Sequence, residues 1–77
     1  MNSPYDLPYR VEVHFPMDRT FAMDKAAEAA VGQSVTDAGT DGCTRDLGWM
    51  TWGKEAAEAM ASKLKALGLA PIVTKRM

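Results

Sequence analysis

The sequence has little cysteine, little histidine and no long apolar run. Cys43 and His14 are the only residues of their kinds among 77. An intrachain disulfide is therefore excluded, and two such ligands fall short of the four that structural zinc requires. No stretch approaches the 18 apolar residues of a membrane span, and the N-terminus lacks the features of a signal peptide. Because a lone cysteine is typical of a reducing compartment, we expect a cytoplasmic protein with no cofactor, metal or membrane association.

The sequence also lacks a surplus of charge of either sign. Nine Lys and Arg residues against ten Asp and Glu residues give a formal net charge of −1. Nucleic-acid-binding domains usually carry a basic excess, because neutralisation of phosphates dominates their affinity. The near balance therefore disfavours a nucleic-acid partner. The length and the hydrophobic fraction of 47% indicate one ordinary globular domain.

Hydrophobic periodicity predicts the order strand, helix, strand, strand, helix, strand. The strands are expected at residues 9–15, 34–38, 43–52 and 70–75, and the helices at 21–31 and 54–67. Residues 39–42 end in Asp-Gly, a pair that favours hairpin turns. This order is that of a ferredoxin-like βαββαβ sandwich, an α+β fold with an antiparallel sheet and both helices on one face. The first strand is expected between the third and the fourth, and residues 1–8 form an N-terminal arm to a domain over 9–77.

No catalytic arrangement is recognisable. Any triad or dyad would have to use His14, yet neither a Gly-x-Ser-x-Gly elbow nor the context of an activated cysteine is present. Strict alternation in the first strand places His14 on its solvent side. The spacing of Asp37, Asp41 and Asp46 does not match a calcium loop. We therefore expect no enzymatic activity.

One stretch resembles a known family. Residues 45–52, Arg-Asp-Leu-Gly-Trp-Met-Thr-Trp, resemble the third-strand signature of the RNA recognition motif, K/R-G-F/Y-G/A-F-V-x-F/Y. Direct matches are Arg45, Gly48 and Trp52, similar residues are Trp49 and Met50, and residues 55–60 resemble the start of the family's second helix. The resemblance implies a ferredoxin-like fold and a sheet that binds single-stranded RNA or DNA. Against that activity, Leu47 stands in place of a base-stacking ring and Glu12 occupies the position of a second ring.

The same resemblance assigns the two faces of the third strand. It directs Gly48, Met50 and Trp52 toward the helices, and Leu47 and Trp49 outward, into a polar rim. The candidate binding residues are thus Trp49, Leu47, Arg45, Arg10, His14 and Glu12. An apolar spot with a polar rim is typical of a protein-binding surface. The alternatives are that the N-terminal arm, through Tyr5 and Leu7, covers this face, or that a second copy does so in a homodimer.

These observations favour a small non-enzymatic protein-binding module. In its size and its lack of motifs, the chain resembles the small phage-encoded inhibitors of bacterial defence, such as anti-CRISPR proteins. That resemblance implies inhibition by binding to a protein complex. The alternative is a single-stranded RNA- or DNA-binding domain of the RNA-recognition-motif type, and a third hypothesis is a dimeric regulatory domain that senses a small molecule.

Overall fold

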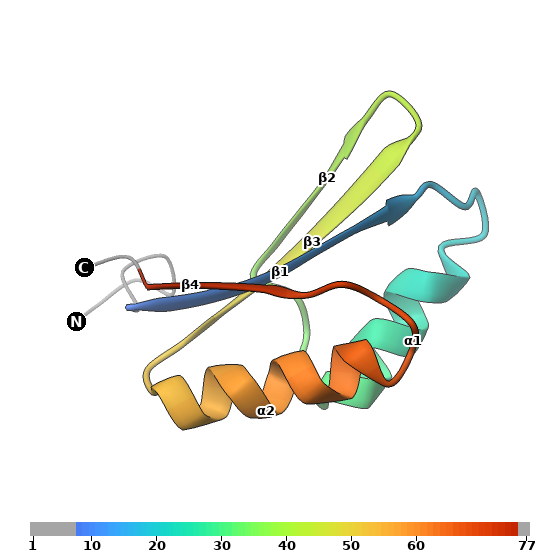
Figure 1. The fold of residues 1–77 in the computed structure, drawn as a ribbon. Helices are drawn as coiled ribbons and strands as arrows, with labels where there is room; N and C mark the ends of the chain where they lie inside the picture. Colours follow the sequence, from blue (N-terminus) through green and yellow to red (C-terminus); the bar gives the residue numbers. More distant parts are fainter. Residues whose placement is uncertain (1–7, 76–77) are drawn as a thin grey trace.

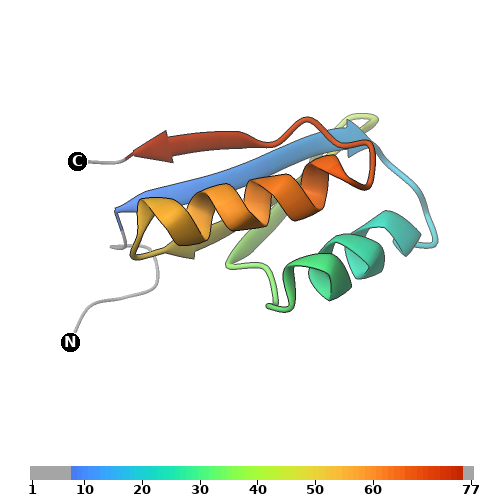
Figure 2. The same ribbon diagram turned by 60° about the horizontal axis from the view of Figure 1, so that its bottom comes forward.

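The computed structural model describes residues 8–75 and contains an antiparallel four-stranded sheet with both helices on one face (Figures 1 and 2). The elements are β1 (Tyr9–Pro16), α1 (Ala22–Val31), β2 (Asp37–Asp41), β3 (Thr44–Thr51), α2 (Lys54–Lys65) and β4 (Ile72–Lys75). The strand order is β2-β3-β1-β4. The predicted ferredoxin-like arrangement is therefore confirmed, including the place of β1 between β3 and β4. Of the predicted N-terminal arm, residues 1–7 lie outside the described part of the chain.

The second strand lies further along the chain than the sequence predicts. It covers Asp37–Asp41 instead of residues 34–38, and Asp41 pairs directly with Thr44. The turn is therefore Gly42-Cys43, and Gly42 has a φ of 62°. Cys43 has no positive φ. A two-residue hairpin with positive φ at its first central position alone is the type II′ turn, which favours glycine there. The Asp-Gly signal located the hairpin correctly, but its aspartate belongs to the strand.

The hydrophobic core lies between the sheet and the two helices. In β1 the buried residues alternate, as predicted, and Val11 and Val13 are fully buried. The register places Trp49 opposite Val11 and Leu47 opposite Val13, and cross-strand neighbours share a face. The remaining buried members of this core are Phe15, Ala27, Val31, Ala57 and Leu64. The helix-facing side of β3 is thus the side of Leu47 and Trp49.

The end of α2 directs the chain back to the sheet. Gly68 has a φ of 85°, and its N–H donates to the carbonyl of Lys65 at 2.9 Å. The N–H of Leu69 donates to the carbonyl of Leu64 at 3.3 Å. These two bonds form a Schellman ending, in which a glycine in the left-handed conformation is typical. The chain then enters β4, which runs antiparallel to β1 at the edge of the sheet.

Candidate binding surface

The face of the sheet that points away from the helices is called the open face below. It carries the predicted residues Arg10, Glu12 and His14 of β1, on the opposite side from the buried Val11 and Val13. The register places further residues beside them, namely Met50, Gly48 and Asp46 of β3, Asp37 and Gly39 of β2, and Ile72 and Thr74 of β4. The open face is therefore a mainly polar surface that all four strands share.

Arg10 organises the middle of the open face. Its Nη1 donates to Asp37 Oδ2 at 2.6 Å, and its Nη2 donates to Asp37 Oδ1 at 2.8 Å. The hydrogen bond to Asp37 raises the pKa of Arg10, and the charges of Asp37, Glu12 and Asp46 add to that effect against partial burial. The guanidinium is therefore a permanent cation in a fixed orientation, since two parallel bonds to one carboxylate define its plane.

Gly48 allows this ion pair to form. It lies on β3, between the strands that carry Arg10 and Asp37. A Cβ at residue 48 would lie 2.7 Å from Arg10 Cζ and 2.7 Å from Asp37 Oδ1. Because real Cβ atoms do not approach other atoms so closely, the arginine crosses β3 only above a residue without a side chain. The glycine of the predicted signature thus has a structural role on the open face, and the prediction that it faces the helices is wrong.

The remaining charges make the open face acidic. Glu12 Oε2 lies 3.7 Å from Arg10 Nε and 3.5 Å from His14 Nε2. Asp46 pairs in register with His14. Among the described residues of the open face, one arginine therefore stands against the four carboxylates of Glu12, Asp37, Asp41 and Asp46. Such a surface repels phosphate groups, which must be neutralised when nucleic acid binds.

Two of the predicted binding residues are in the core. Leu47 and Trp49 are both 0% exposed, so the prediction that they form an outward apolar spot is wrong. The indole N–H of Trp49 donates to the backbone carbonyl of Gln33 at 2.9 Å, which satisfies its only polar group. The physical reason is the register, since Val11 and Val13 form the apolar face of β1 and their partners on β3 must share that face.

Arg45 also lies away from the open face. Its Nη2 and Nε donate to Asp24 Oδ2 of α1 at 2.8 and 3.0 Å. Its guanidinium lies 5.1 Å from the centre of the Phe21 ring, at the start of α1. Arg45 therefore joins β3 to the helical layer, and its assignment to the rim of a binding surface is wrong. Of the six predicted binding residues, the structure brings together only Arg10, Glu12 and His14.

The exposed tryptophan is Trp52, which the sequence assigned to the core. Its side chain is 64% exposed, and it lies at the junction between β3 and α2. Continuing the alternation of β3 by one residue places it on the side of Met50, which is opposite Arg10. The exposure of Trp52 could have been predicted from the pairing of β3 with β1, which places Leu47 and Trp49 on the apolar face of β1. Once these two residues face inward, Met50 and Trp52 must face outward.

Among residues 8–75, no group of three or more His, Cys, Asp or Glu side chains is placed to hold a metal ion. Cys43 is exposed in the hairpin turn. No helix in this part of the chain is long and apolar enough to cross a membrane.

Comparisons with known proteins found no match. No protein-family model, no curated protein and no solved structure matches this chain significantly. The open face, Trp52 and the charges around them are therefore the features from which a function can be inferred.

Proposed function

We propose that this domain is a non-enzymatic protein-binding module that contacts its partner through Trp52 and the adjoining open face. The observation that carries the proposal is the 64% exposure of Trp52. A tryptophan buries about 150–250 Å² when it is covered, and tryptophan is enriched among the residues that dominate binding energies. A chain with only two tryptophans leaves one of them outside its core, where a partner can cover it.

The polar part of the open face supports the same function. The bonds between Arg10 and Asp37 hold both side chains in place before a partner arrives, and such preorganisation lowers the entropic cost of association. Since Glu12, Asp37 and Asp46 outnumber Arg10, a partner with basic groups around an apolar pocket would complement this surface. The charges would then select the partner, and Trp52 would supply most of the affinity.

The alternative is binding of single-stranded RNA or DNA through the sheet, as in the RNA recognition motif. Trp52 offers one exposed ring on which a base could stack. However, Trp49 is buried, and the open face has more carboxylates than cations. The surface charge therefore favours protein over nucleic acid.

A finer form of the proposal is an inhibitor, such as a phage-encoded protein of the anti-CRISPR class, that blocks a protein complex by covering part of its surface. An inhibitor of this kind would need only a rigid surface with one strong anchor. Trp52 beside the Arg10–Asp37 pair fits that description.

The test is capture of partners from a lysate of the native host with the tagged wild type and Trp52→Ala. The captured protein is then purified, and its affinity is measured by calorimetry at two salt concentrations. We expect Trp52→Ala to weaken binding by about 2 kcal/mol or more, roughly 30-fold. Met17→Ala is the matched control, because Met17 is an exposed apolar residue that follows β1 at the end far from Trp52. Equal affinity of Trp52→Ala and wild type would refute the proposal, and an RNA partner with a steep salt dependence would establish the alternative.

A further inference from the structure

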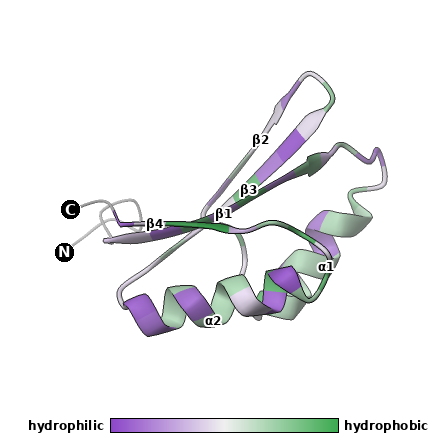
Figure 3. Ribbon diagram, in the orientation of Figure 1, coloured by the Kyte–Doolittle hydropathy of each residue, from purple (hydrophilic) through white to green (hydrophobic). Residues whose placement is uncertain are grey.

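The two edges of the sheet differ in how well they are protected against the addition of another strand. β2 has the sequence DAGTD, and charged residues and glycine discourage the addition of another strand. β4 has the sequence IVTK, and all four of its residues are exposed. Ile72 is 50% exposed and Val73 39%, and Figure 3 shows β4 as hydrophobic at its start and hydrophilic at its C-terminal end. Within the described sheet, the β4 edge therefore combines β-forming apolar residues with an outer side that pairs with no other strand.

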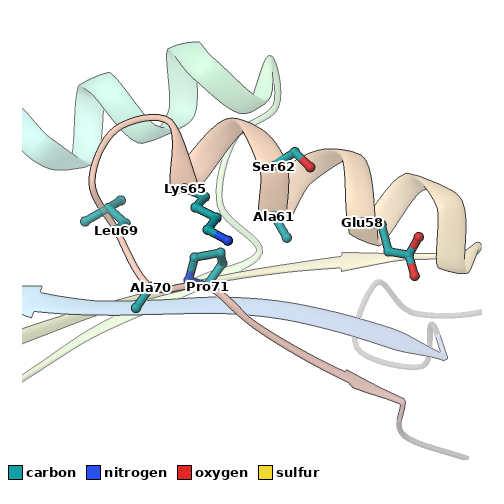
Figure 4. A pocket seen from close by; sticks show the side chains of 7 residues that line it. All are labelled: Glu58, Ala61, Ser62, Lys65, Leu69, Ala70 and Pro71. Atoms are coloured by element: carbon teal, nitrogen blue, oxygen red, sulfur yellow. The ribbon is translucent and has the colours of Figure 1, made fainter.

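The helices leave β4 uncovered on their side of the sheet. Figure 2 shows α2 running in front of β1, with β4 to its outside. Two cavities of about 550 and 640 Å³ lie along α2, and Glu58 lines both of them. The first lies between α2 and residues 69–71, which lead into β4, and the second lies between α2 and Tyr9, Val73 and Lys75 of the sheet. Their apolar walls include Ala61, Leu69, Pro71 and Val73, and Figure 4 shows Ala61 and Lys65 of α2 above Pro71. The space along β4 is called the α2–β4 groove below.

The α2–β4 groove is basic, in contrast to the open face. Lys65 lines the first cavity, and Lys54 and Lys75 line the second. Glu58 is the only carboxylate among the lining residues, and it lies 3.9 Å from Lys54 Nζ. Because both members of that pair are largely exposed, their interaction is weak. The groove therefore carries two more positive than negative charges, next to a strand edge that can accept main-chain hydrogen bonds.

We propose that the β4 edge and the α2–β4 groove bind an extended acidic segment of a partner protein, which adds to the sheet as a fifth strand. The main chain of the segment pairs with the outer edge of β4, and alternate apolar side chains enter the groove beside Val73 and Leu69. Carboxylates of the segment lie near Lys54, Lys65 and Lys75. A second copy of the chain fits less well, because two-fold pairing of β4 with β4 brings the same lysines of both copies to one edge. Trp52 lines neither cavity of this groove.

The first experiment selects random 12-residue peptides from a display library on the purified protein. We expect the enriched peptides to carry their apolar and acidic residues at alternate positions, so that both kinds lie on the side of the strand that faces the groove. The enriched peptides are then synthesised, and NMR is used to map the amides they affect, which should include Ile72–Lys75. Absence of any enriched peptide, or enriched peptides that map to the open face or to β2, would overturn the proposal.

Charge-reversal variants test the groove directly. Lys65→Glu/Lys75→Glu should weaken binding of the selected peptide at least tenfold, because carboxylates then face carboxylates. Lys25→Glu/Lys63→Glu is the matched control with the same change in net charge, since both lysines are exposed and line neither cavity. Equal losses in the two double variants would show that only net charge matters and would overturn the proposal. Two further results would also overturn it. One is that the wild type sediments as a dimer and Lys75→Glu as a monomer. The other is that oligo(dT) binds to the groove in preference to the peptide.

Discussion

Arg10 and Asp37 form a two-bond ion pair across an intervening strand. Arg10 lies on β1, Asp37 lies on the edge strand β2, and the guanidinium crosses β3 above Gly48. Arg10 Nη1 also lies 3.8 Å from the sulfur of Met50, which is 2% exposed. Since β2 pairs only with β3 within the described sheet, this ion pair is a direct side-chain connection from the edge to the centre of the sheet.

Gly48→Ala should separate Arg10 from Asp37. The new methyl group would overlap the end of the arginine side chain, which is flexible and can move aside. We therefore expect a loss of about 1 kcal/mol of unfolding free energy, the scale of a partly exposed ion pair, and not loss of the fold. Urea denaturation of Gly48→Ala, Arg10→Ala and the double variant checks this. In the Arg10→Ala background the added methyl should cost less, because only its close approach to Asp37 Oδ1 remains. An equal cost in both backgrounds would show that Gly48 has another role.

The ion pair between Arg45 and Asp24 should contribute more than a surface pair. The two side chains are only 18% and 13% exposed, so removal of one partner leaves a poorly solvated charge. We expect Asp24→Ala to destabilise the protein by about 1–3 kcal/mol. Glu58→Ala is the control, because its pair with Lys54 is 3.9 Å long and exposed, and we expect a change below about 0.5 kcal/mol. Similar values for the two variants in urea denaturation would contradict the difference in burial.

Stability should decrease in acid partly through Asp18. The backbone N–H and the hydroxyl of Thr20 donate to its carboxylate at 2.9 and 2.8 Å, and these bonds lower the pKa of Asp18. A carboxyl with a lower pKa in the folded state binds fewer protons there than in the unfolded state. Its contribution is therefore present above the ordinary aspartate pKa of about 3.9 and is lost as pH falls through the folded value.

Carbon-detected NMR titration measures this pKa directly. The Asp18 carboxyl should titrate below the range of a solvated aspartate. Thr20→Ala should raise its pKa only in part, because the backbone N–H of residue 20, which is the larger cause, remains. A titration midpoint of Asp18 that matches an unperturbed aspartate in the wild type would show that the turn does not form in solution.

The order of the elements could be predicted because each depends on local signals. Alternation in β1 and helical spacing in α2 both reappear in the structure. The start of β2 was less predictable, because its sequence DAGTD has no apolar alternation. Pairing with β3 determines its position, and such long-range pairing leaves no local pattern in the sequence.

The candidate site was harder to predict than the fold, since it depends on which side of β3 faces the helices. A shift of one residue exchanges the faces of a strand, and β3 has apolar residues on both sides, Leu47 and Trp49 on one and Met50 on the other. The family resemblance predicted the wrong side of β3 to face the helices. Pairing with the strictly alternating β1 predicts the correct side. The contact of Arg10 with Asp37 above Gly48 could not be predicted without that pairing.

The two tryptophans should therefore respond to substitution in opposite ways. Trp49 is fully buried against the helices, and its indole N–H is bonded to Gln33. Trp49→Ala should cost about 3–5 kcal/mol, which removes most of the stability of a small domain near the lower end of about 5–15 kcal/mol. Trp52 is mostly exposed, so Trp52→Ala should change the unfolding free energy by no more than about 0.5 kcal/mol. Thermal melting of both variants gives the comparison, and Trp49→Phe is a useful intermediate because it keeps an aromatic ring but loses the hydrogen bond.

Fluorescence provides an independent check of the two faces of β3. Trp49→Phe leaves Trp52 as the only tryptophan, and its emission should be that of a solvated indole before and after unfolding. An emission maximum of this variant that moves to longer wavelength on unfolding would mean that Trp52 is buried and that the faces of β3 are reversed.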